Sequence, residues 1–152
     1  MTVRATVARA ITPYGVVAVH DAARPLVAPG AIGRCVEEAA ASGAATLAHR
    51  VVETVKRDDG AGGVGEAVER DGLWAMETPQ AFSRELLERA YGLVRERGEA
   101  VTDEVSAVRA LGERVVLLEN DGPNLKVTVP GDLAVVVALL AERRRSEVGT
   151  SD

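Results

Sequence analysis

Asp21 and Arg24 are the first pair of side chains in this sequence that could bind a substrate. They lie three residues apart, directly after the apolar run of residues 16–19. A carboxylate and a guanidinium at this spacing can hold a hydroxyl group, a phosphate or a metal-bound phosphate. Arginine suits phosphate because its fork donates two parallel hydrogen bonds. The pair could equally be a salt bridge that makes a turn rigid, because many ion pairs are only structural.

A second set of candidates combines hydroxyl groups and positive charges at the expected boundaries of strands and helices. Such groups are what a phosphate monoester site needs. Taken singly, each is more typical of strand-forming threonine or of a solvated surface cation. The set comprises Thr54, Lys56, Arg70, Thr78, Thr102 and Lys126.

Two further patterns carry no chemistry. Residues 60–65 match G-x-G-x-x-G, but charged residues precede them and Gly72 interrupts the segment after them, so the strand and helix of a dinucleotide site are not predicted. A hairpin turn explains the glycines better. His20 and His49 have no Cys or second His at metal-ligand spacing, so we interpret both as structural and expect no metal site.

Strand-like and helix-like segments alternate along the chain and must position these side chains. Apolar runs at 16–19 and 115–118 predict buried strands, and residues 125–128 predict a further one. Helical spacing predicts helices over 31–41 and 83–97, the second with Ser83 as its N-cap. A shorter helix should follow residues 102–104 and end at Gly112, and the last should run from Pro130 to Arg145.

This alternation predicts an α/β fold with a mostly parallel twisted sheet and flanking helices. In such sheets ligands bind beyond the carboxyl ends of strands, where Asp21 and Arg24 would lie. Two strand-like segments around the Gly-rich turn predict a projecting β-hairpin arm over about residues 48–75. Such an arm needs a surface to lie against.

Bulk composition limits the remaining choices. The chain has 152 residues, which predicts one domain over residues 1–145 and a disordered tail over 146–152. A net charge of −5 argues against a nucleic-acid partner. No signal peptide is evident, and the most apolar window, residues 133–141, is too short to span a membrane. We therefore expect a cytoplasmic protein with no membrane partner.

Taken together, six segments give the sequence a specific resemblance, from about Val16 to Leu140. They resemble the 2-C-methyl-D-erythritol 4-phosphate cytidylyltransferase family of the non-mevalonate isoprenoid pathway. The segments are Val19-His20-Asp21-Ala22-Ala23-Arg24-Pro25, Glu53-Thr54-Val55-Lys56, Arg70-Asp71-Gly72-Leu73-Trp74, Thr78-Pro79-Gln80-Ala81-Phe82, Thr102-Asp103-Glu104, and Asn124-Leu125-Lys126-Val127-Thr128 with Pro130 and Asp132-Leu133.

The resemblance implies a Rossmann-like nucleotidyltransferase fold and a reaction. The substrate phosphate would attack the α-phosphorus of CTP, and pyrophosphate would leave. Mg²⁺ would travel with the nucleotide phosphates rather than in a protein cage. The chain would form a homodimer in which the hairpin arm crosses to the partner.

The resemblance also implies roles for individual residues. Arg70 and Lys126 would be the catalytic pair that positions the methylerythritol phosphate for attack. Asp21 and Arg24 would fix its hydroxyl groups and phosphate. Thr54, Thr78 and Thr102 would add hydrogen bonds to the substrate. Ala22 would lie beside the nucleotide. Because Thr54 and Arg70 belong to the arm, they would serve the partner's site.

The chain departs from the family pattern at its start. The family begins with a strand and a Gly-rich loop that cradles the triphosphate. Residues 1–11 of this chain instead look like the end of the family's helix that precedes the strand leading to Asp21. We therefore expect the family's N-terminal strands to be missing and the chain alone to be inactive. Arg50 and Glu53 also stand where the family usually has Pro and Asp. Two alternatives stay open: a ribitol-5-phosphate cytidylyltransferase, and a non-catalytic remnant that dimerises and binds a polyol phosphate.

Overall fold

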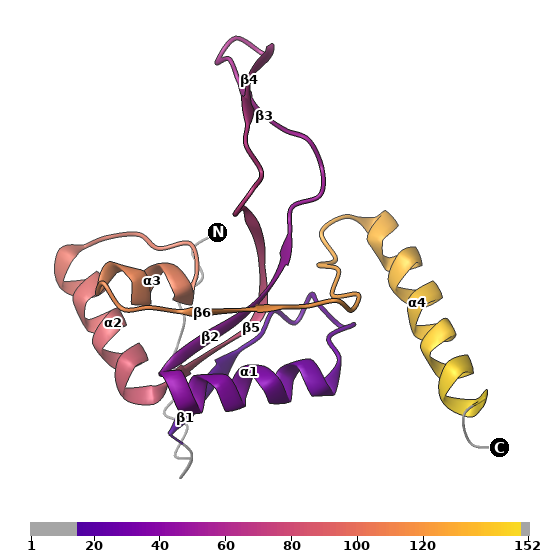
Figure 1. The fold of residues 1–152 in the computed structure, drawn as a ribbon, viewed down its shortest axis with the longest axis horizontal. Helices are drawn as coiled ribbons and strands as arrows, with labels where there is room; N and C mark the ends of the chain where they lie inside the picture. The colour runs from indigo at the N-terminus through magenta and orange to yellow at the C-terminus, as the bar shows by residue number, and fades with distance from the viewer. Residues whose placement is uncertain (1–14, 150–152) are drawn as a thin grey trace.

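The computed structural model describes residues 15–149, which form one mixed sheet, a hairpin arm and four helices. The sheet contains β1 (Val16–Val19), β5 (Trp74–Ser83), β2 (Ala44–Arg50) and β6 (Val116–Glu119), in that spatial order. The pair β2–β6 is parallel, whereas β5 is antiparallel to both β1 and β2. Three of the four strands therefore point the same way, and the α/β class is confirmed (Figure 1).

The reversed strand β5 was not expected from the sequence. The chain leaves β2, passes out and back through the arm, and returns beside β2 as β5. A hairpin connection of this kind joins antiparallel strands, whereas a parallel pair needs a crossover, usually through a helix. The arm thus determines the direction of β5.

Helices cover both faces of the sheet. On one face α1 (Pro29–Ser42) packs its buried Ala31, Cys35 and Ala39 against alternate residues of β2 and β5. On the other face α2 (Arg84–Arg97) and α3 (Glu104–Ala110) pack around the fully buried Phe82. Alternation of side chains along β2 and β5 supplies both clusters, because neighbouring strand residues point to opposite faces.

Three local signals determine where these helices begin and end. Pro29 occupies the first turn of α1, and Gly43 ends the helix with a φ of 92°, which a residue with a Cβ rarely adopts. The Ser83 hydroxyl accepts a hydrogen bond from the Leu86 amide at 3.3 Å and so caps α2. The core helices are confirmed with ends within two residues of the predicted ones.

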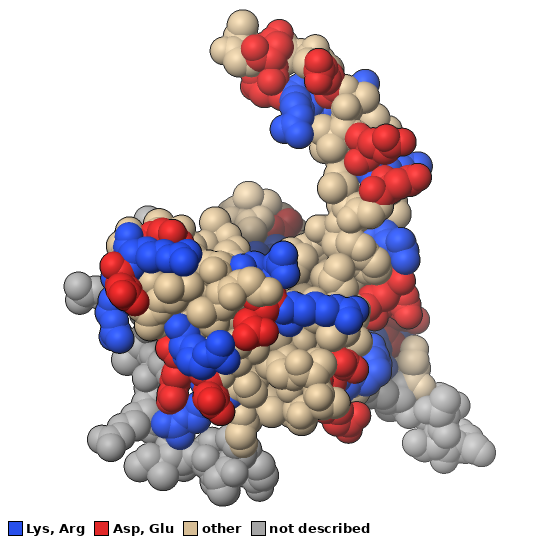
Figure 2. Space-filling view, turned by 60° about the vertical axis from the view of Figure 1, so that its left-hand side comes forward, with Lys and Arg blue, Asp and Glu red and all other residues tan. Residues whose placement is uncertain are grey.

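The hairpin arm is also confirmed. It consists of β3 (Val55–Asp58) and β4 (Val64–Val68), an antiparallel pair that forms a separate two-stranded sheet. The arm projects far from the body in Figure 1, and Figure 2 shows both acidic and basic side chains along it. Val52 and Val64 are 69% and 80% exposed, so the arm buries little apolar surface within this chain.

Two expectations about the C-terminal part are corrected. Residues 125–128 form no strand, because their loop runs past the β1–α1 connection, where the Val127 amide donates to the Ala23 carbonyl at 2.8 Å. The last helix, α4 (Pro130–Gly149), extends beyond Arg145, so residues 146–149 are helical rather than part of a tail. Residues 150–152 and the predicted helix end at 1–11 lie outside the described residues.

Helix α4 lies to one side of the body (Figure 1). The Arg143 guanidinium donates to the Leu26 carbonyl at 2.6 Å, and Val136 is buried. Leu133 and Val137 are nevertheless 57% and 59% exposed. Within residues 15–149, no helix is long and apolar enough to span a membrane.

Candidate active site

A cavity of about 630 Å³ lies at the carboxyl end of β1. Its walls come from the β1–α1 loop, from β5, from the start of α3, and from the loop that follows β6. This is the position that the strand-end argument predicts for a ligand. Six of the predicted site residues line it: Asp21, Ala22, Arg24, Thr78, Thr102 and Lys126.

Asp21 lies between two cations in this cavity. Lys126 Nζ is 3.0 Å from Asp21 Oδ2, and Arg24 Nε is 3.5 Å from the same oxygen. Burial disfavours the charged carboxylate, but the hydrogen bond and charge of Lys126, with those of Arg24, outweigh burial and lower the pKa of Asp21. The two positive charges of this cluster outnumber its one negative charge, while the carboxylates of Glu77, Asp103 and Glu104 line other parts of the cavity. Asp21 and Arg24 therefore form a salt bridge with each other and also line the cavity.

Arg24 is held by backbone oxygens from two distant segments. Its Nη1 donates to the Asn124 carbonyl at 2.7 Å, and its Nη2 donates to the Met76 carbonyl at 3.3 Å. Only 14% of the side chain is exposed. The guanidinium is therefore a fixed positive charge at the cavity wall, and the backbone takes much of its hydrogen-bonding capacity.

Thr78 joins β5 to the loop that carries Asp21. Its hydroxyl oxygen accepts a hydrogen bond from the Asp21 amide at 3.0 Å and lies 2.9 Å from His20 Nδ1. His20 is thus a partner of Thr78 and, through Nε2, of the Arg24 carbonyl at 3.1 Å. These contacts hold the β1–α1 loop against the sheet and agree with a structural role for His20.

Thr102 lies just before α3, next to its N-cap residue Asp103, in a network that the sequence did not single out. Its hydroxyl is 3.1 Å from Ser106 Oγ. Asp103 accepts from the Ser106 amide at 2.9 Å and from Gln80 Nε2 at 3.0 Å. Burial raises the pKa of Asp103, but the Ser106 and Gln80 hydrogen bonds outweigh burial and leave the pKa below its usual value. Gln80 therefore links β5 to the start of α3, next to Thr102.

Tyr91 closes the same side of the cavity from α2. Its hydroxyl donates to Glu104 Oε1 at 2.8 Å. Burial, reinforced by the hydrogen bond and negative charge of Glu104, raises the pKa of Tyr91. Tyr91 thus stays a neutral donor. A tyrosine among the inward positions of an amphipathic helix was available in the sequence as a sign of a polar partner, because buried tyrosine hydroxyls usually have one.

Thr54 and Arg70 are not among the residues that line this cavity. Thr54 is exposed at the base of the arm. Arg70 donates through Nη1 to the Val52 carbonyl and borders a smaller cavity of about 190 Å³ with Arg50. The structure therefore places these two residues at the arm, as the sequence implied, and brings neither to the cavity of its own chain.

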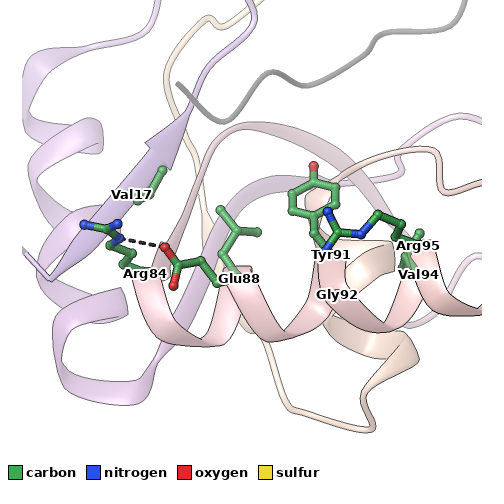
Figure 3. Close-up of a pocket in the computed structure, with 8 residues that line it drawn as sticks. Val17, Arg84, Glu88, Tyr91, Gly92, Val94 and Arg95 are labelled. Atoms are coloured by element: carbon green, nitrogen blue, oxygen red, sulfur yellow. Dashed lines mark hydrogen bonds and ion pairs between the residues drawn. The ribbon is translucent and has the colours of Figure 1, made fainter. Parts of the chain in front are cut away.

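A second large cavity, of about 520 Å³, lies between β1 and α2 (Figure 3). Val17, Leu87 and Val94 supply apolar wall, and Arg84 is paired with Glu88 at 2.8 Å. None of the predicted site residues lines it. The cavity at the end of β1 is therefore the better candidate for a phosphorylated ligand.

The donor set at the candidate site provides no all-protein cage for a magnesium ion. Among residues 15–149, no three His, Cys, Asp or Glu side chains come close enough to hold a metal. Asp21, the carboxylate beside the cations, already bonds Lys126. The Mg²⁺ that the family resemblance implies would be held mainly by the phosphates of CTP.

Comparison with known proteins gives one consistent result. The sequence model of the family "2-C-methyl-D-erythritol 4-phosphate cytidylyltransferase" matches residues 2–142. A protein of that name from Pelotomaculum thermopropionicum is 42% identical over 137 residues, which cover 89% of this chain and 58% of the relative. One from Deinococcus radiodurans is 44% identical over 128 residues, covering 84% of this chain and 55% of the relative.

Solved structures agree with the sequence matches. The crystal structure of 2-C-methyl-D-erythritol 4-phosphate cytidylyltransferase from Thermus thermophilus superimposes with a TM-score of 0.77 at 36% identity, covering 83% of this chain and 62% of that one. A synthase structure from Anaerococcus prevotii gives a TM-score of 0.75 at 25% identity, covering 87% of this chain and 62% of that one. The chain spans a little over half the length of these relatives.

Proposed function

Because this chain belongs to the 2-C-methyl-D-erythritol 4-phosphate cytidylyltransferase family, we propose that it forms the polyol-phosphate side of a cytidylyltransferase active site. In the proposed reaction an oxygen of the methylerythritol phosphate attacks the α-phosphorus of CTP. A new phosphorus–oxygen bond forms, the bond to the bridging oxygen breaks, and pyrophosphate leaves. The cavity at the end of β1 supports this proposal, because it unites two cations with two threonine hydroxyls.

Positioning and charge stabilisation are the main contributions a protein makes to such a transfer. Lys126 suits the attacking phosphate, because its side chain is 47% exposed and its ammonium carries three donors. Arg24 supplies a second positive charge that is fixed in place. Asp21 would accept hydrogen bonds from substrate hydroxyls, and Thr78 and Thr102 would add contacts from β5 and from the loop before α3. Ala22, at the same mouth, would lie beside the nucleotide.

The hairpin arm supports a homodimer in this proposal. Thr54 and Arg70 would complete the site of the second copy, because they lie on the arm rather than at their own cavity. An arm with exposed Val52 and Val64 gains from a surface that covers these side chains. A twofold dimer is the commonest assembly that could provide this surface. The proposal places the protein in the cytoplasm.

Calorimetric titration of the chain with three ligands tests the proposal. We expect 2-C-methyl-D-erythritol 4-phosphate to bind, and Lys126→Ala to weaken that binding by at least tenfold. Tighter binding of ribitol 5-phosphate would favour the alternative enzyme, and binding of neither polyol phosphate would refute the proposal. Pyrophosphate release on adding CTP would show the complete reaction, whereas binding without release would indicate a non-catalytic polyol-phosphate binder.

A further inference from the structure

Glu77 is a buried carboxylate in the middle of β5 that the proposed reaction does not use. It is 5% exposed. His49 Nδ1 lies 2.8 Å from its Oε1, and the side-chain amides of Asn120 and Asn124 donate to its Oε2, each at 2.8 Å. These partners come from β2 and from the loop after β6. One carboxylate therefore ties three separate segments together beneath the cavity.

We propose that Glu77 is a positioning residue for the polyol-phosphate pocket. Its carboxylate accepts a hydrogen bond from the Asn124 side chain, and the Asn124 backbone carbonyl in turn accepts one from Arg24. Glu77 thereby determines the positions of the two pocket cations, Arg24 and Lys126, relative to each other. The proposal rests on the function proposed above for this cavity. Glu77 borders the cavity, but its oxygens are engaged by the three donors, so it acts through its neighbours rather than on the substrate.

The first link runs from Glu77 through Asn124 to Arg24. Asn124 is 4% exposed, and its Nδ2 donates both to Glu77 Oε2 and to the Thr78 carbonyl, the latter at 2.9 Å. Its backbone carbonyl accepts the hydrogen bond from Arg24 Nη1 at 2.7 Å. If the Asn124 side chain loses Glu77, the acceptor that orients Arg24 loses its support. Little solvent reaches this position, so water does not readily replace the lost partner.

The second link runs along the loop after β6 to Lys126. Glu77 holds this loop at Asn120 and Asn124, and the Val127 amide holds it to the Ala23 carbonyl at 2.8 Å. Lys126 lies between these two attachments, and its ammonium reaches Asp21. The position of Lys126 therefore depends on the same buried carboxylate as the position of Arg24.

Three variants test this role by calorimetric titration with 2-C-methyl-D-erythritol 4-phosphate. Glu77→Leu removes both acceptor oxygens at similar side-chain volume. We expect the dissociation constant to rise about tenfold or more, because Arg24 and Lys126 would no longer be held in their positions. Glu77→Gln keeps one oxygen for the two asparagine amides, and we expect the constant to stay within about threefold of the wild type. Leu87→Ala, in the core and not among the residues that line the cavity, is the control for a general loss of stability.

The pattern of binding decides the outcome. The positioning role is supported if Glu77→Leu binds the polyol phosphate weakly and Glu77→Gln binds it nearly as tightly as the wild type. Leu87→Ala should bind normally although its Tm falls by a comparable amount. Normal binding by Glu77→Leu, or equal loss in both Glu77 variants, would overturn it. If Glu77→Leu does not fold, Asn124→Ala replaces it, since it cuts the same link while leaving the other two partners of Glu77, and unchanged binding would again overturn the role.

A failure of the proposed function gives a different result. If the wild-type chain binds no polyol phosphate, that function fails, and NMR of the free protein decides the role of Glu77 separately. We then expect the Arg24 Nε–H and Lys126 amide signals to shift in the Leu or Asn124→Ala variant and to keep their positions in Glu77→Gln. Unmoved signals in the former would overturn the positioning role.

Discussion

Replacing Lys126 by methionine should change the ionisation of Asp21 in a direction that the structure determines. The variant keeps much of the length of the side chain but removes the ammonium that lies 3.0 Å from Asp21 Oδ2. Lys126 is the main influence that lowers the pKa of Asp21, and burial, which raises it, remains in the variant. We therefore expect the pKa of Asp21 to rise.

The stability change should be small because both side chains reach solvent. Coulomb's law gives about 1.4 kcal/mol for unit charges at this separation in water. Salt screening and the cost of ordering the Lys126 side chain reduce the value to about 0.5–1 kcal/mol. Asp21 has a lowered pKa in the folded state, so its stabilising effect is present above the pKa of the unfolded chain and is lost as the pH falls through the folded-state pKa. Lys126→Met should lose stability at neutral pH and less at acid pH.

Two measurements check this prediction. A carbon-13 NMR titration of the Asp21 carboxyl follows its pKa, and urea unfolding at neutral and acid pH follows the stability. Lys56→Met is a matched control, because Lys56 lies on the arm in β3, away from the cavity. An unchanged or lower pKa of Asp21 in Lys126→Met would refute the arrangement of charges described here, as would an equal change in the control.

Three other changes test local features. Ser83→Ala removes the hydroxyl that caps α2, so the free energy of unfolding should fall by about 1 kcal/mol in urea, and Ser83→Thr should recover most of it. Arg50→Ala removes a guanidinium that lies 4.5 Å from the Trp74 ring centroid; we expect a loss of about 0.5–1 kcal/mol and altered Trp74 fluorescence, and an unchanged spectrum would contradict the contact. Asp103→Ala removes the cap of α3; because the pKa of Asp103 is lowered, the loss should be present at neutral pH and should disappear as the pH falls through its folded-state pKa, which thermal unfolding measures.

The parts of the fold that the sequence predicts well are those with strong local signals. Pro29, Gly43 and Ser83 mark helix ends through backbone chemistry that does not depend on the rest of the molecule. The abrupt change from the apolar residues 16–19 to His20 and Asp21 marks the end of β1, and with it the position of the cavity. These signals needed no knowledge of tertiary structure.

Strand β5 and the loop after β6 were harder to predict because tertiary contacts decide both. β5 contains Glu77, Thr78, Pro79 and Gln80, which interrupt the apolar pattern of a buried strand. The polar side chains among them are paired with side chains and backbone from distant segments, so they stabilise the interior without being apolar. Residues 125–128 were wrongly predicted as a strand. Their composition is strand-like, but the segment pairs with no neighbouring strand and forms a loop held by the hydrogen bond from the Val127 amide.

The same reason explains the site residues that the sequence missed. The side chains of Glu77, Gln80 and Asn124 form hydrogen bonds with side chains that lie 23 to 47 residues away along the chain, so no spacing in the sequence brings them together. One signal was available: a carboxylate and an amide inside a strand-length segment need buried partners. Arg70 and Thr54 raise a different question, since their expected partner is another copy of the chain.

One strand connects the arm, the cavity and the core. β5 begins at Trp74 beside the arm, passes Thr78 at the cavity, and ends just after Phe82 in the core (Figure 1). A partner that holds the arm would therefore act on the same stiff element that forms the cavity wall. If so, dimer formation and substrate binding are thermodynamically coupled, and reciprocity requires each to change the free energy of the other by the same amount. The dissociation constant of the dimer would then differ between the free and the substrate-bound protein.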